Sequence, residues 1–157
     1  MKGNEKIIGH LNLRLAEELA AINQFMVHAK MCGNWKYKRL AETIEKRAVD
    51  EMKHAEKLIA RILFLEGRPM VSTLSTLRIG GEVARMHVND HGAEEESIQG
   101  YNESIQLAAE VGDNGTRQLF QEILKDEEDH ICWIEAQLDQ IKQAGPQNYL
   151  GKQIYEQ

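Results

Sequence analysis

Two Glu-x-x-His pairs are the residues of this 157-residue sequence best suited to chemistry. Glu51 and His54 form the first pair, and Glu127 and His130 form the second. Residues three apart lie on one face of an α-helix, so each pair can direct a carboxylate and an imidazole to one point. With no thiolate in the set, these ligand types favour Fe(II) or Mn(II) over zinc or an iron–sulfur cluster.

The carboxylate of Glu51 falls where its helix should be apolar. Steps of three and four residues trace the predicted buried face of that helix through Ile44, Ala48, Glu51, Ala55, Leu58, Ile62 and Leu65. Removing an unpaired carboxylate from water costs several kcal/mol. A partner that compensates the charge of Glu51 is therefore expected in the core.

Two further glutamates, Glu18 and Glu94, occupy the same kind of position in other predicted helices. Glu18 precedes Glu51 by 33 residues, and Glu94 precedes Glu127 by 33 residues. The chain thus reads as two copies of one helical hairpin, which predicts a site with pseudo-twofold symmetry between them. The same interval selects Glu94 over its neighbours Glu95 and Glu96, which we expect on a solvated face. The other predicted faces contain Leu11, Leu15, Ile22, Phe25 and Ala29; His87, His91, Ile98, Tyr101, Ile105 and Ala108; and Phe120, Ile123, Ile131, Ile134, Leu138 and Ile141.

The elements that must position these residues are all helical. Only two prolines and few aromatic residues accompany abundant Leu, Ala, Glu and Lys, which favours an all-α chain. We expect a single domain over 1–157, with helices at about 4–34, 38–66, 82–111 and 114–143, and a short fifth helix at about 147–155. The long connection between the second and third helices can run the length of a four-helix bundle, which brings the four glutamates to one level.

The net charge of the chain limits the classes of molecule that it is expected to bind. The formal charge of −6 argues against a nucleic-acid partner and favours small cations. No apolar run is long enough for a membrane span or a signal peptide, so a cytoplasmic protein with no membrane partner is expected. Four buried carboxylates would balance two divalent cations, with both imidazoles neutral. His87 and His91 share the predicted face of Glu94, and could extend the metal site or serve as core or subunit-contact residues.

Several stretches resemble the bacterioferritin family from end to end: MKG, LNLRLAEELAAINQF, DEMKHAEKLIARILFLEGRP, IGG, ILKDEEDHICWIEAQLD and QNYL. The resemblance implies a ferritin-like bundle and a hollow shell of 24 chains that stores ferric mineral. It implies two non-haem iron ions per subunit, held by Glu18, Glu51, His54, Glu94, Glu127 and His130, with Glu51 and Glu127 bridging. It also implies haem b, one per subunit pair, bound by one methionine from each chain, and Met52 stands at that position.

The chain departs from the family pattern at three positions. Phe25 replaces a tyrosine common beside the di-iron centre, which removes a phenol at that point. Lys46 and Arg47 replace a His-Glu pair, which puts in doubt any iron site on the inner surface that depends on that pair. Read from the residues alone, Met52 lies off the buried face beside Val49, Ile59 and Leu63, where a partly apolar stripe predicts a subunit contact.

The expected function is iron storage and detoxification, with a di-iron ferroxidase that oxidises Fe(II) to Fe(III) using O2 or H2O2. The ligand pattern also fits a di-iron oxygenase or peroxidase, or a dimanganese catalase. A third reading is a haem-binding electron-transfer or assembly subunit with a structural di-metal site. The sequence leaves open which oxidant is used, whether the 24-mer contains a second subunit type, and whether a ferredoxin-type reductant releases the iron.

Overall fold

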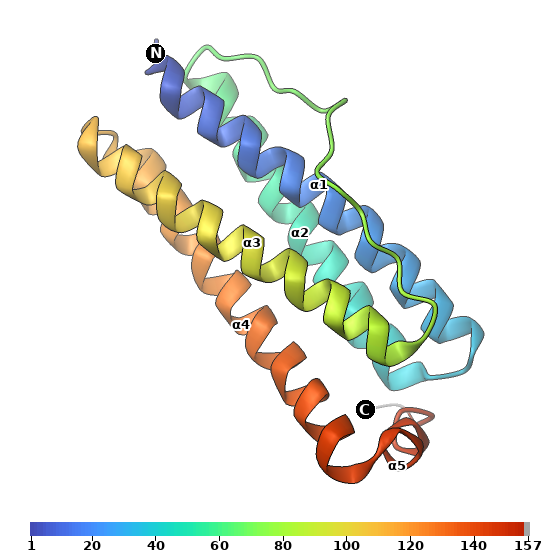
Figure 1. Cartoon of the computed structure of the whole chain (residues 1–157). Helices are drawn as coiled ribbons and strands as arrows, with labels where there is room; N and C mark the ends of the chain where they lie inside the picture. The colour runs from blue at the N-terminus through green and yellow to red at the C-terminus, as the bar shows by residue number, and fades with distance from the viewer. Residues whose placement is uncertain (156–157) are drawn as a thin grey trace.

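Four long helices form two antiparallel hairpins, α1–α2 and α3–α4, joined by one long crossover, and a short fifth helix follows them (Figure 1). The computed structural model describes residues 1–155. Its helices are α1 (Glu5–Asn34), α2 (Lys38–Phe64), α3 (Val83–Glu110), α4 (Asn114–Ala144) and α5 (Pro146–Gly151), and no strand occurs among the described residues. The predicted fold class, an all-α ferritin-like four-helix bundle with a short fifth helix, is confirmed.

The helix ends follow from local side-chain and backbone chemistry. Asn4 caps α1, because its side-chain oxygen accepts hydrogen bonds from two backbone N–H groups of the first turn. Helix α2 ends two residues earlier than predicted, since Glu66 adopts a left-handed backbone (φ 62) and Gly67 N–H donates to the carbonyl of Ile62 at 2.8 Å. Helix α5 is shorter than predicted, and residues 152–155 form turns.

The crossover between α2 and α3, residues 65–82, lies along α1 (Figure 1). Four hydrogen bonds from its backbone N–H groups reach positions along the length of α1. Met70 donates to Asn12 Oδ1 at 2.8 Å, and Ser75 donates to the Ala16 carbonyl at 3.3 Å. Farther along, Arg78 donates to Gln24 Oε1 at 3.0 Å, and Gly80 donates to His28 Nε2 at 2.9 Å. The connection therefore spans the bundle and returns the chain so that α3 and α4 repeat the hairpin of α1 and α2.

The predicted buried faces match the structure most closely in α2, where all seven residues from Ile44 to Leu65 on that face are buried. Helix α3 differs. Its buried face includes Met86, Asp90, Ser97 and Ser104, whereas His91 is only partly buried. An aspartate is not expected in a core, so a pattern of apolar residues could not place Asp90 there.

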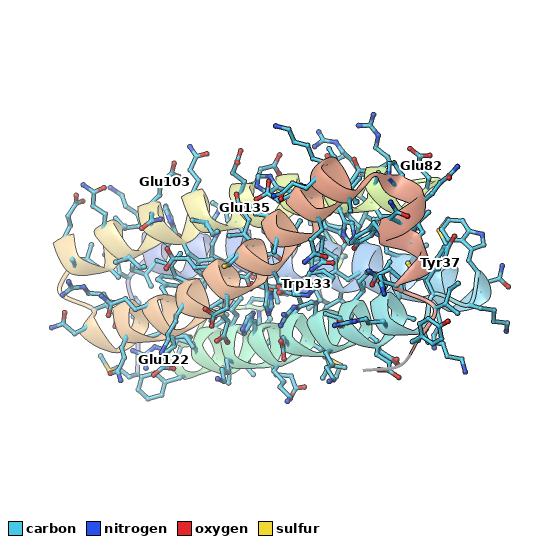
Figure 2. The ribbon with its side chains drawn as sticks, turned by 90° about the horizontal axis from the view of Figure 1, so that it is seen from below. Tyr37, Glu82, Glu103, Glu122, Trp133 and Glu135 are labelled. Carbon is cyan, nitrogen blue, oxygen red and sulfur yellow. The ribbon has the colours of Figure 1, made fainter. Side chains whose placement is uncertain are left out.

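Two apolar clusters fill the core, one toward each end of the bundle, and the four glutamates lie between them. Outward-facing side chains such as Glu103 of α3 and Glu122 of α4 are exposed (Figure 2). Within residues 1–155, no helix has both the length and the apolar character needed to cross a membrane.

Candidate metal centre

The structure brings all six predicted residues together in the middle of the bundle. Their relative exposures are only 1–2%. One atom from each forms two overlapping groups, in which the atoms lie within 4.8 Å of one another. The groups are Glu18, Glu51, His54 and Glu127, and Glu51, Glu94, Glu127 and His130. Glu51 and Glu127 belong to both groups, so their positions suit carboxylates that bridge two ions.

Both imidazoles are oriented by aspartates from the opposite hairpin. His54 Nε2 lies 2.8 Å from Asp126 Oδ2, and His130 Nε2 lies 3.1 Å from Asp50 Oδ2. A carboxylate partner favours the proton on Nε2, which leaves Nδ1 to face the cluster as a lone-pair donor. Sequence reasoning missed both aspartates, although each directly precedes the glutamate of a Glu-x-x-His pair. That repeated Asp-Glu was the available signal.

The two halves are related by near-equal distances as well as by sequence spacing. His54 Nδ1 lies 3.0 Å from Glu127 Oε1, and His130 Nδ1 lies 2.9 Å from Glu51 Oε1. The same nitrogens lie 3.5 Å from Glu18 and 3.6 Å from Glu94, respectively. The two imidazole rings stack with centroids 6.3 Å apart. The pseudo-twofold relationship predicted from the 33-residue spacing is thus present in the side-chain geometry.

Burial makes ionisation of the carboxyl groups in the cluster unfavourable unless cations bind there. It raises the pKa of Glu51 well above its ordinary value, that of Glu94 to about 7 and that of Glu127 to about 8. Burial alone would lower the pKa of His54, but the carboxylates that face it have the larger effect and raise this pKa to about 11. For His130, burial dominates and keeps the pKa below its ordinary value. Cations that enter would therefore displace protons.

The buried polar atoms of the cluster have the chemistry expected of ligands for a pair of metal ions. Seven of them have no hydrogen-bond partner within residues 1–155: Glu18 Oε2, Glu51 Oε1, His54 Nδ1, Glu94 Oε1, Glu94 Oε2, Glu127 Oε1 and His130 Nδ1. Buried polar atoms in folded proteins are otherwise almost always paired. Here the unpaired atoms converge, and the oxygen-rich set with two nitrogens suits two borderline or hard divalent ions.

A small cavity joins this cluster to the surface beneath the crossover. The cavity is about 30 Å³ and is lined by Glu51, Glu94 and Glu127 at one end. Its other lining residues include the exposed Glu96 and, on the crossover, Ser75. The cavity therefore places the buried carboxylates of the cluster close to the exposed carboxylate of Glu96.

The symmetry fails at one pair of positions. The hydroxyl of Tyr101 in α3 donates to Glu18 Oε1 at 2.6 Å. The residue 76 positions earlier, the same offset that relates Glu18 to Glu94, is Phe25. Phe25 lies in α1, is buried, and lines a small cavity with Glu94 and His130. Sequence analysis placed Tyr101 on the buried face of α3, but did not predict its contact with Glu18.

His87 and His91 do not join the cluster. His87 Nε2 lies 3.0 Å from the hydroxyl of Tyr149, which donates to Gln137, and burial lowers the pKa of His87 to about 4. His91 Nε2 lies 2.8 Å from Glu135 at the surface. Of the two alternatives, the structure supports a core role for His87, which is fully buried, and it places His91 against Glu135 rather than in the cluster.

Arg47 and Lys46 lie near the cluster but outside it. Arg47 is 3.7 Å from Asp50, the aspartate that orients His130, and its guanidinium lies over the ring of Trp133 at 5.9 Å. Figure 2 shows Trp133 pointing between α4 and α2. Lys46 is exposed. The side chains of Lys46 and Arg47 are positively charged. A second metal-binding pair at these two positions would need neutral or acidic side chains instead.

Met52 lies on the outer side of α2, next to Glu51 in sequence but away from the cluster. Its side chain is 46% exposed, and Val49 and Leu63 on the same helix are exposed as well. A thioether at that position can reach a group outside the bundle without disturbing the buried carboxylates.

Comparisons with known proteins agree with this geometry. The family model described as "Ferritin-like domain" matches residues 8–144. Bacterioferritin from Brucella melitensis is 42% identical over 149 residues, covering 95% of this chain and 92% of the relative. Bacterioferritin from Rhodobacter capsulatus is 38% identical with the same coverage of both chains, and a bacterial ferritin from Synechocystis is 38% identical over 98% of this chain and 99% of its own length. With an all-helical bundle and a match over nearly its whole length, the chain belongs to the bacterioferritin family.

Proposed function

We propose that this protein stores iron and that its buried cluster is a ferroxidase centre. Bacterioferritins are iron-storage proteins, and the convergence of seven unpaired polar atoms on one buried space carries the finer assignment. Glu18, Glu51, His54, Glu94, Glu127 and His130 hold two Fe(II), with Glu51 and Glu127 shared between them. Iron bound as a pair supplies two electrons to O2 or H2O2, and Fe(III) then moves to a mineral store.

Each residue of the centre has a definite task. The four carboxylates offset the charge of two divalent cations. Asp50 and Asp126 orient the two imidazoles so that Nδ1 faces inward. The apolar clusters at both ends keep bulk water away from the carboxylates, which strengthens their attraction for cations.

Paired histidine variants test the centre. His130→Gln removes a proposed ligand, whereas His91→Gln changes a histidine that is held at the surface by Glu135. We expect His130→Gln to slow Fe(II) oxidation by about tenfold or more, and His91→Gln to leave the rate near that of the parent. Equal rates in the two variants, with both proteins folded, would refute the assignment.

We propose further that the protein assembles into a shell of 24 chains built from twofold dimers. The exposed side chains of Val49, Met52 and Leu63 on one face of α2 support a subunit contact there. Sedimentation should give a species near 24 chains. Aerobic addition of Fe(II) should load far more iron than two ions per chain. Saturation near two per chain would favour a di-iron oxygenase, a peroxidase, or a haem-binding electron-transfer or assembly subunit.

Haem b, one per subunit pair, is the second proposed cofactor, with Met52 from each chain as its axial ligand. The exposed thioether of Met52 fits a ligand that acts across a twofold contact. Met70 on the crossover is 45% exposed, close to the 46% of Met52, and provides a matched control. Met52→Leu should abolish haem binding while Fe(II) oxidation persists, and Met70→Leu should retain haem. Full haem content in Met52→Leu would contradict this role.

The proposed setting is the cytoplasm, with a ferredoxin-type reductant releasing stored iron. A second subunit type in the shell is compatible with the same dimer contact. Mass spectrometry of shells purified from the native cell would identify it directly.

A further inference from the structure

Hydrogen bonding distinguishes the two outer carboxylates of the cluster. Glu18 Oε1 accepts a hydrogen bond from Tyr101 at 2.6 Å, whereas Glu18 Oε2 has no hydrogen-bond partner in residues 1–155. Both oxygens of Glu94 lack a partner in the same part of the chain. Glu18 therefore presents one oxygen to the cluster, and Glu94 presents two.

Packing around Tyr101 fixes its phenol in place. Tyr101 is fully buried, its ring lies edge-on to Phe120 with centroids 5.9 Å apart, and the Arg14 guanidinium lies 5.9 Å from its centroid. Arg14 is itself held by Glu17 at 2.6 Å and by Ser104 at 3.2 Å. A fully buried ring packed against Phe120 and Arg14 cannot swing its hydroxyl away from Glu18 without repacking the core.

The Glu94 side is arranged differently. Glu94 lines two small cavities beside the cluster, and Glu18 lines neither of these two. Phe25, at the position equivalent to Tyr101, offers Glu94 no hydrogen-bond donor. Glu94 thus has adjacent space and two available oxygens, whereas Glu18 has a rigid donor on one side.

We propose that Tyr101 is a positioning residue that makes the two metal positions unequal: Glu18 binds its ion through Oε2 alone, and Glu94 binds its ion through both oxygens. The inference rests on the proposed ferroxidase centre and specifies its two halves. An ion with one fewer protein oxygen keeps one more coordination position for an oxidant or a second ligand. The ion beside Glu18 is then the one that keeps this additional position.

Crystals of the protein loaded with Co(II) alone test the proposal, because this ion reports carboxylate binding without oxidation by O2. We expect two Co(II) ions in the parent protein, with Glu18 bound through one oxygen and Tyr101 still bonded to Oε1, and with Glu94 bound through two. In Tyr101→Phe, Glu18 should bind through both oxygens. Tyr149→Phe, which removes another buried hydroxyl, should leave both carboxylates as in the parent.

The reciprocal variant moves the phenol to the other half. Combining Tyr101→Phe with Phe25→Tyr should make Glu94 the one-oxygen ligand and Glu18 the two-oxygen ligand. Identical binding by Glu18 and Glu94 in the parent, or a Glu18 geometry unchanged in Tyr101→Phe, would overturn the inequality while leaving the metal centre intact. Absence of Co(II) from the cluster would overturn both the centre and the inequality. Visible absorption of the Co(II) protein gives a second readout, since the lower-coordinate ion absorbs more strongly.

Discussion

The two ends of the bundle flank the same cluster but differ in the side chains and contacts that hold them together. One end, toward the N-terminus of α1, is filled by aliphatic and aromatic side chains such as Leu11, Leu58 and Phe120. Its buried polar groups, including Arg14 and Thr116, are bonded to neighbours beside this core. The core at this end depends mainly on apolar contact.

Hydrogen-bonded polar groups run through the other end. Asp90 Oδ1 accepts from Gln24 Nε2 at 2.8 Å and lies 2.9 Å from His28 Nδ1. Because Gly80 N–H donates to His28 Nε2, the proton of neutral His28 must lie on Nδ1, where it bonds to Asp90. A second set of hydrogen bonds links His87 of α3 and Gln137 of α4 to Tyr149 of α5.

The comparison of the two ends distinguishes the contacts that stabilise the fold from those that position the crossover and α5. Apolar burial supplies most of the folding free energy, whereas a buried hydrogen bond contributes little net but is costly to leave half made. The polar end uses such bonds to attach α5 and the last part of the crossover, where the apolar side chains of Leu77 and Ile79 stay exposed. Gln24 and His28 bind the last part of the crossover, and Tyr149 fixes α5.

The apolar end should show the largest single effect. Phe120→Ala removes a fully buried ring and should lower the free energy of unfolding by about 3–5 kcal/mol. Leu13→Ala, on the same end but 55% exposed, should change it by less than about 0.5 kcal/mol. Denaturant unfolding of the metal-free protein measures both. Similar losses in the two variants would end the distinction between core and surface at this end.

Asp90→Leu should have the next largest effect, because it leaves His28 and Gln24 buried with donors unpaired. We expect a loss of about 2–3 kcal/mol and faster hydrogen exchange of the Gly80 amide as the crossover loosens. Asp90→Asn keeps an oxygen acceptor and should cost clearly less. If Gly80 remains as protected in Asp90→Leu as in the parent, the network does not hold the crossover.

Tyr149→Phe deletes only a hydroxyl and should cost about 1–2 kcal/mol, since Gln137 loses a donor and His87 an acceptor. Tyr155→Phe is the matched control, because Tyr155 is 70% exposed. Thermal unfolding compares them. Equal melting temperatures would mean that α5 is held by its apolar contacts alone.

Asp113→Ala should have the smallest effect, at the turn that closes the apolar end. Asp113 caps α4 through Thr116 and lies 3.0 Å from Arg61, so its loss should cost about 1 kcal/mol near neutral pH. Although partial burial opposes it, bonds to Thr116 and Arg61 lower the pKa of Asp113. A lowered folded-state pKa means that the stabilisation is present above the ordinary aspartate pKa and disappears as pH falls through the folded-state value. The parent and variant should therefore converge in stability at acid pH, with Asp129→Ala as the exposed control.

Local periodicity was sufficient to predict the buried face of α2 and the six cluster residues. The register of each buried face follows from the 3.6-residue repeat of its own helix, and the matched 33-residue intervals select Glu94 from its neighbours. The bond from Tyr101 to Glu18 depends on how α3 docks on α1, and no spacing within one helix encodes it. Asp90 was missed for a related reason, because its partners Gln24 and His28 lie on another helix and make an otherwise unfavourable burial acceptable.

The exchange of aspartates between hairpins has a consequence for the order of folding. Contacts within α1–α2 and within α3–α4 are local and should form early, whereas His54 meets Asp126, and His130 meets Asp50, only after the hairpins dock. Docking also brings four carboxylates together, so repulsion opposes the final step unless protons or cations arrive with it. Divalent cations present during refolding should therefore speed docking or slow its reversal, and stopped-flow refolding with and without Co(II) measures the difference. Cation binding and the docking of the two preformed hairpins would then be coupled steps.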